Sequence, residues 1–130
     1  MSFLSRLSSD VGLASATSAN GTARNGATLD LGKVQPGTLC VQGTVTIVTG
    51  SVVCTFKQQV SQDATTWYNV KLPNNAAAVT VTADETVALT APSSVHGFRY
   101  FRCVATLSGA STASGDLTAV TYRYRRYEEA

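Results

Sequence analysis

The chain has 130 residues, the size of one ordinary domain, and 44% of them are apolar. Charged residues make up only 14%, against about 25% in a typical soluble domain, so much of the surface must consist of uncharged polar residues. A formal net charge of +2 does not indicate nucleic-acid binding, the three cysteines lack metal-ligand spacing, and no apolar stretch reaches the roughly 18 residues that span a bilayer.

The first predicted element is an extended N-terminal arm over residues 1–27. From about residue 9 onward this segment has few large apolar side chains. Its beginning also lacks the apolar run of a secretory signal, so we expect the protein to be made in a cytoplasm. Because such a segment can bury little surface by itself, we predict that the arm becomes ordered only in an assembly.

The next two runs show the period of two that is typical of half-buried strands. Val45 and Ile47 alternate with polar residues, and beyond Gly50 the alternation resumes with Cys54 and Phe56. These two runs predict an antiparallel hairpin about the glycine.

Turn-forming residues then dominate residues 61–67, which predicts a chain reversal into a short strand that begins near Tyr68. Further along, the runs Val79–Val81 and Val87–Leu89 flank an Asp-Glu pair. This arrangement predicts a second hairpin.

The last third contains two more predicted strands, residues 98–107 and 117–124, before a polar C-terminal tail over residues 125–130. About eight short strands without a helical period favour an all-β fold, so residues 28–124 are predicted to form an antiparallel β-sandwich of the jelly-roll type. The core predicted from the alternation comprises Val45, Ile47, Cys54, Phe56, Val104 and Val120.

No combination of residues typical of an enzyme is found. The single histidine, His96, lies in a loop beside a glycine and is interpreted as structural. Cys40, Cys54 and Cys103 fall within apolar strand patterns and are interpreted as buried thiols. Most carboxylates lie at predicted turns, where aspartate stabilises the backbone. We therefore predict no catalytic residue, no cofactor and no metal site.

Arginines alternate with aromatic residues in Phe98–Arg102 and Tyr122–Tyr127. Single-stranded nucleic acid can be bound by such a pattern, because bases stack on aromatic rings and arginines contact phosphates. Neighbours in a strand point to opposite faces, however, so each arginine shares a face with an aromatic residue. We interpret these arginines as stacking or ion-pairing residues of a sheet or an interface, and expect no nucleic-acid partner.

Three segments occur in a characteristic order: Leu29–Gly32 after the Ser/Ala/Thr-rich arm, Phe56–Trp67, and Phe98–Arg102 followed by Ser114–Val120. Together they resemble the small capsid cement (decoration) proteins of tailed phages, although the turn glycine expected near Ala64 is missing. The resemblance implies a jelly roll without catalysis, on the outside of a virion capsid, bound to the major capsid protein as a homo-oligomer on its lattice. The candidate capsid contacts are Arg24, Asn25, Trp67, Arg99, Arg102, Arg123 and Arg125.

Two other functions remain open. A carbohydrate- or receptor-binding module of a virion fibre would use Trp67, Tyr68 or Tyr100 as a stacking platform. A shell-forming coat protein would turn its arginine-rich strands toward a genome.

Overall fold

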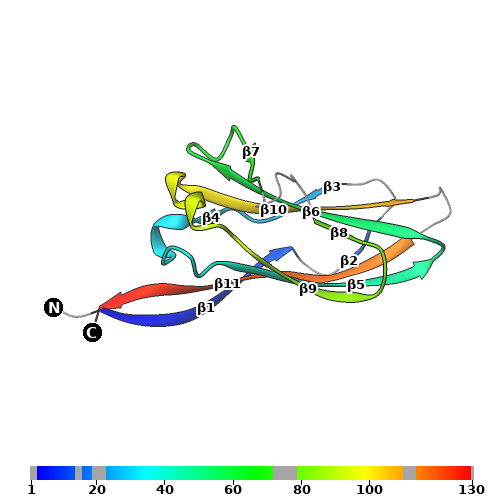
Figure 1. Cartoon of the computed structure of the whole chain (residues 1–130), viewed down its shortest axis with the longest axis horizontal. Helices are drawn as coiled ribbons and strands as arrows, with labels where there is room; N and C mark the ends of the chain where they lie inside the picture. The colour runs from blue at the N-terminus through cyan, green and yellow to red at the C-terminus, as the bar shows by residue number, and fades with distance from the viewer. Residues whose placement is uncertain (1–2, 14–15, 19–22, 72–78, 110–113, 130) are drawn as a thin grey trace.

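The computed structural model describes residues 3–13, 16–18, 23–71, 79–109 and 114–129, which fold into two antiparallel sheets packed face to face (Figure 1). Sheet A, the lower layer in Figure 1, has the order β1-β11-β5-β9, with β2 also beside β11. Its strands are β1 (Phe3–Leu13), β2 (Ala16–Ser18), β5 (Cys40–Thr49), β9 (Glu85–Thr90) and β11 (Ser114–Glu129).

Sheet B is the upper layer and has the order β3-β10-β6-β7, with β4 also beside β10 and β8 also beside β6. Two short 3-10 helices, η1 (Leu31–Lys33) and η2 (Ser93–Gly97), lie in connections at one end of the sandwich. The strands of sheet B are β3 (Ala23–Asn25), β4 (Leu29–Asp30), β6 (Val52–Ser61), β7 (Tyr68–Asn69), β8 (Val79–Val81) and β10 (Tyr100–Gly109).

The connectivity is that of a jelly roll. The chain passes from sheet A (β1, β2) to sheet B (β3, β4) and back to β5, then to β6–β8, β9, β10 and β11 in alternate sheets. As a result β11 lies between β1 and β5, and β10 lies between β3 and β6. Nested antiparallel pairs divided over two sheets define this fold, so the predicted β-sandwich of the jelly-roll type is confirmed.

Both predicted hairpins are wrong. Strand β5 belongs to sheet A and β6 to sheet B, and β8 and β9 are divided in the same way. At Gly50, which has a φ of 70°, the chain crosses from one sheet to the other. Alternation reports which side chains of a strand face the core, and a hairpin and a crossing between sheets produce the same alternation. The pattern alone therefore could not distinguish them.

The core lies between the inner faces of the two sheets. Val45, Cys54, Phe56 and Val120 are buried there as predicted, and Ile47 is partly buried against them. Val104 is also buried, but it belongs to the opposite face of β10 and is not a member of the central cluster. The inward-facing residues of β10 are Phe101, Cys103, Ala105 and Leu107.

The predicted arm and tail differ most from the structure. Strand β1 pairs with β11 from Phe3–Glu129 to Leu13–Val120, and β2 and β3 pair with β11 and β10. The described parts of residues 1–27 and 125–130 are therefore strands of the sheets rather than an arm and a tail outside residues 28–124. Large apolar side chains are not needed for this, because a sheet is joined through the hydrogen bonds of the backbone.

Tyr122 fastens the N-terminal strands to the rest of the molecule. Its buried hydroxyl donates to the carbonyl of Ala27 and accepts from the N–H of Cys103, both at 2.9 Å. Its ring lies against Gly12, where a Cβ atom would come within 2.5 Å of the ring. The residue thus links β11 of sheet A with β10 of sheet B and with the segment between β3 and β4.

Candidate functional site

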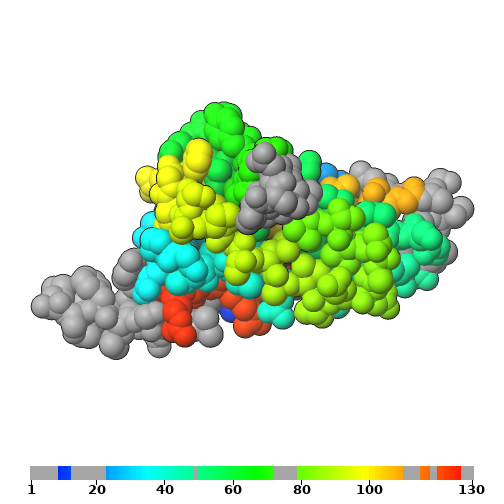
Figure 2. All heavy atoms as spheres, in the orientation of Figure 1, coloured from blue at the N-terminus to red at the C-terminus, as the bar shows by residue number. Residues whose placement is uncertain are grey.

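A tight turn between β6 and β7 presents Trp67 to the outer face of sheet B. The carboxylate of Asp63 accepts hydrogen bonds from the backbone N–H groups of Thr65 and Thr66, both at 2.9 Å. These bonds lower the pKa of Asp63. Ser61 Oγ accepts from the N–H of Ala64, which has a φ of 61°. The turn stands at the top of the molecule in Figure 1 and protrudes there in Figure 2.

Arg102 lies on this outer face and stacks on the indole ring. Its guanidinium carbon is 4.2 Å from the centroid of Trp67, well inside the range of a cation–π contact. Its Nε donates to Gln59 Oε1 at 2.9 Å, and Gln59 Nε2 donates in turn to Asn69 Oδ1 at 3.0 Å. We call Trp67, Arg102, Gln59 and Asn69 the Arg102 row, because it crosses the neighbouring strands β10, β6 and β7.

The structure separates the seven candidate contact residues into different regions. Trp67 and Arg102 are in contact, and Asn25 pairs with Val104, two residues along β10 from Arg102. Arg24 pairs with Ala105 and is half-buried. The remaining three lie elsewhere: Arg99 precedes β10, and Arg123 and Arg125 are exposed on β11 of sheet A.

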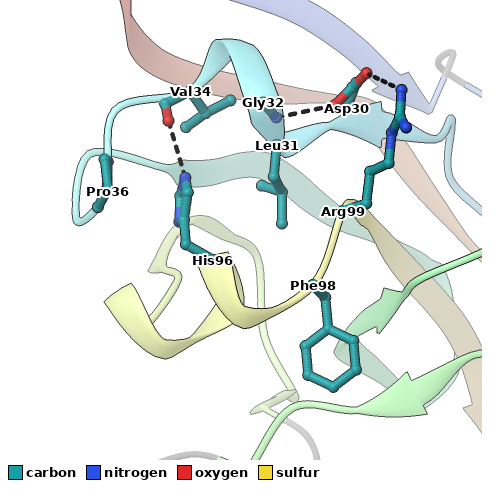
Figure 3. Close-up of a pocket in the computed structure, with 8 residues that line it drawn as sticks. All are labelled: Asp30, Leu31, Gly32, Val34, Pro36, His96, Phe98 and Arg99. Atoms are coloured by element: carbon teal, nitrogen blue, oxygen red, sulfur yellow. Dashed lines mark hydrogen bonds and ion pairs between the residues drawn. The ribbon is translucent and has the colours of Figure 1, made fainter.

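A hollow of about 490 Å³ opens at the end of the sandwich that carries η1 and η2 (Figure 3). At one side Arg99 and Asp30 form an ion pair, with 3.7 Å between Nη2 and Oδ2. At the other side His96 Nε2 donates to the carbonyl of Val34 at 2.9 Å. The floor between them includes the buried side chain of Leu31.

The hollow does not bring together a nucleophile and a base. His96 Nδ1 has no hydrogen-bond partner among the described residues, and the carboxylate of Asp30 lies with Arg99 on the other side. Sequence reasoning interpreted His96 as structural, and its bond to Val34 gives it a role in joining two connections of the sandwich.

The buried cysteines are poor nucleophiles. Burial raises the pKa of Cys54 to about 11 and that of Cys103 to about 12, so both remain thiols near neutral pH. Within the described ranges, no three His, Cys, Asp or Glu side chains lie together as metal ligands would. Among the same residues, no helix has both the length and the hydropathy that crossing a membrane requires.

Comparison with known proteins gives similarities of structure but none of sequence. No family model and no curated protein matches the chain. A chain of the T13 infectious bursal disease virus particle superposes with a TM-score of 0.53 and 12% identity over 92% of this chain and 30% of that chain. A chain of the Gx strain of that virus has a TM-score of 0.50, with 13% identity over 92% of this chain and 33% of that one.

A Bacillus endospore appendage, a disulfide-linked pilus, matches with a TM-score of 0.46 and 16% identity over 93% of this chain and 89% of the pilus chain. This chain spans about a third of the length of the viral chains that it matches. At 12–13% identity the likeness to the viral chains is one of fold. The jelly roll described above is thus an architecture that also occurs in an icosahedral virus particle.

Proposed function

We propose that the protein is a structural component of a virion that binds the outside of the capsid and stabilises it, as cement proteins do. The observation that carries this proposal is the ribbon formed by β1 and β11, which extends past the other strands at one end of the sandwich (Figure 1). The connection after η1 accompanies β11 as far as Arg126, through a bridge from Val34. Beyond that residue, the only described partner of β11 is β1.

A two-stranded ribbon is only marginally stable in water, so the end of this one is suited to lie on a neighbouring protein. The low content of charged residues also suits an attached protein, because few ions must lose their water when the surface is covered. The jelly-roll fold and the resemblance of three sequence segments to phage cement proteins support the same function.

Added contact area is the proposed mechanism. A modest interface that is repeated over a symmetric shell supplies many contacts that must break together before the shell opens. The partner is the major capsid protein, and copies of this chain meet as a homo-oligomer on its lattice. The protein is made in the host cytoplasm and resides on the capsid surface, without a nucleic-acid partner.

A heat-release assay on virus particles tests the proposal. Complete particles, particles that lack the protein, and depleted particles rebuilt with it are heated while release of the genome is measured. Depleted particles should still close but should open at a lower temperature, and adding the protein back should restore the original temperature. Identical release curves for complete and depleted particles would exclude stabilisation. Failure of particles to close without the protein would favour a shell-forming coat protein instead.

The ribbon is tested with a shortened protein that lacks residues 1–5 and 127–130. This deletion removes only the pairs at the end of the ribbon, whereas deletion of residues 1–24 would remove β1 and β2 from sheet A. The shortened protein should retain its melting temperature and bind depleted particles more weakly. Unchanged binding would show that attachment does not use the end of the ribbon.

One observation favours a second candidate function, the binding of a carbohydrate or receptor. Of the three aromatic residues expected as a stacking platform, Trp67 is covered on one face by Arg102, and Tyr100 lies 5.3 Å from the guanidinium carbon of Arg99. Tyr68 is 54% exposed and borders a hollow of about 280 Å³. Sugar-dependent change in its fluorescence or chemical shifts would support this function, and their absence across a glycan panel would oppose it.

A further inference from the structure

Arg102 is held in place, and the part of the chain that the structure describes gives it no anionic partner. The indole of Trp67 covers its face and Gln59 fixes its Nε, while its two terminal nitrogens have no hydrogen-bond or ion-pair partner among the described residues. Two other cations do have an anionic partner: Lys33 Nζ lies 3.2 Å from Asp10 Oδ2, and Arg99 Nη2 lies 3.7 Å from Asp30 Oδ2. Arg102 therefore presents a planar fork of N–H donors to the outside of sheet B.

The carboxylate nearest in the chain to Trp67, that of Asp63, is bound to its own turn through Oδ1. Asp63 Oδ1 accepts from Thr65, Thr66 and Ser61 within the turn. Strands β6, β7, β8 and β10 contain no aspartate or glutamate, and their charged residues, Lys57 and Arg102, are both basic. The one carboxylate in the other described strands of sheet B, Asp30 of β4, is paired with Arg99. The outer face of sheet B around the Arg102 row is therefore complementary to a negatively charged partner.

We propose that the Arg102 row is a clamp for a carboxylate, the side chain of an aspartate or glutamate on the major capsid protein. The inference rests on the proposed function. It adds that the outer face of sheet B contacts the capsid and that Arg102 recognises a carboxylate there. A guanidinium binds a carboxylate through two parallel N–H···O bonds, and an arginine that is ordered beforehand loses less entropy on binding. Gln59 and Asn69 provide that order through their hydrogen bonds.

A protein carboxylate fits this face better than a nucleic acid does. Binding to nucleic acid depends on several cations that neutralise successive phosphates. Here Arg102 is bordered by amides, and the only other charged residue of β6, β7 and β10 is Lys57. A single oriented arginine with uncharged neighbours matches one carboxylate within a larger polar interface.

The experiment measures cosedimentation of the protein with depleted particles. Arg102→Gln should weaken binding at least about tenfold, and Arg102→Lys, which keeps the charge but loses the planar fork, should also weaken it. Lys71→Gln is the control, because it removes the same charge from an exposed side chain outside the row. Melting curves of all variants verify the fold. Binding of Arg102→Gln at the strength of the unmodified protein would overturn the clamp and leave the proposed function intact.

A second arm modifies the particle and needs no variant. Depleted particles are treated with a carbodiimide and a neutral amine, which converts exposed carboxylates to amides. Binding of the unmodified protein should then be lost, while nuclease treatment of the particles should leave it unchanged. Full binding to amidated particles, or loss of binding after nuclease, would overturn the carboxylate assignment. Failure of the unmodified protein to bind untreated depleted particles would overturn the proposed function itself.

Discussion

Ala64 adopts a conformation that ordinarily belongs to glycine. Its φ of 61° is in the left-handed region, where a Cβ atom crowds the backbone. We expect Ala64→Gly to stabilise the protein by about 1 kcal/mol, because the steric cost exceeds the extra entropy of glycine in the unfolded chain. Thermal unfolding measures the effect.

Ala88→Gly is the matched control for this substitution. Ala88 is exposed in the middle of β9, where a glycine destabilises the strand. The melting temperature of the Ala88→Gly variant should therefore fall. A lower melting temperature for Ala64→Gly as well would show that the turn does not adopt the left-handed conformation.

Asp10 joins β1 to the rest of the molecule through charge as well as pairing. Its Oδ2 accepts from Tyr124 Oη at 2.7 Å and from Lys33 Nζ at 3.2 Å. Partial burial raises the pKa of Asp10, but these two hydrogen bonds and the positive charges of Lys33 and Arg126 together outweigh it, so the pKa in the folded state lies below the ordinary value of 3.8.

A carboxylate with a lowered pKa stabilises the fold above its unfolded pKa and loses that effect as the pH falls through the folded pKa. Asp10→Asn should therefore destabilise the protein at pH 7 by less than about 1 kcal/mol, since the group is partly exposed. The difference from the parent should shrink below about pH 4. Urea unfolding over this range is the measurement, and a difference independent of pH would contradict the assignment.

At the scale of elements, β1 behaves as part of sheet A in the free protein. It pairs with β11 along its length, and the carbonyl of Gly12 accepts from the N–H of Ala27 at 2.6 Å. Amide exchange should accordingly find about every second N–H of residues 9–13 protected, as expected for an edge strand. Exchange as fast as in an unfolded peptide would show that this segment is unpaired in the free protein, as the arm predicted from composition would be.

The elements also show how far sequence reasoning can reach. Alternation in β6 correctly placed Phe56 in the core. In β10 it separated the two faces, but the predicted core residue Val104 shares the outer face with Arg102, and Phe101 lies on the inner face. Alternation could not bring Trp67 to Arg102, because that contact depends on the register between strands that are far apart in sequence. Trp67 and Arg102 could each be proposed as a contact residue from the sequence, but their arrangement in the Arg102 row could not be predicted.

The N-terminal segment was misjudged for a related reason. Composition indicates how much surface a segment can bury, and residues 9–27 include few large apolar side chains. Their places are created by others: Tyr122 packs against Gly12, and its hydroxyl binds the carbonyl of Ala27. Small residues that make room for an aromatic ring from a distant strand follow no periodic pattern, so their position in the sheet could not be predicted from the sequence.

For the molecule as a whole, both sheets depend on one core. Phe56 is 2% exposed and lies in the central cluster between the sheets. Phe56→Ala should cost about 3–5 kcal/mol, a large part of the stability of a domain. Chemical denaturation measures it, with Val48→Ala as control, because Val48 is 54% exposed and its truncation should change little. A loss near zero for Phe56→Ala would place that side chain outside the core.

The pairing of β1 with β11 also governs when the protein can fold during its synthesis. Among the described strands, the first to leave the ribosome has its partner in the last, and β10, which holds β3, β4 and β6 together, is made almost as late. Pairings so distant along the chain form slowly, because the intervening chain must first be ordered. Strands β5 and β9, and β6 with β7 and β8, can pair earlier, but β1 to β4 must wait outside the ribosome with their edges unpaired until β10 and β11 are made. Such chains are prone to aggregate, so a demand for chaperones during translation follows from the topology itself.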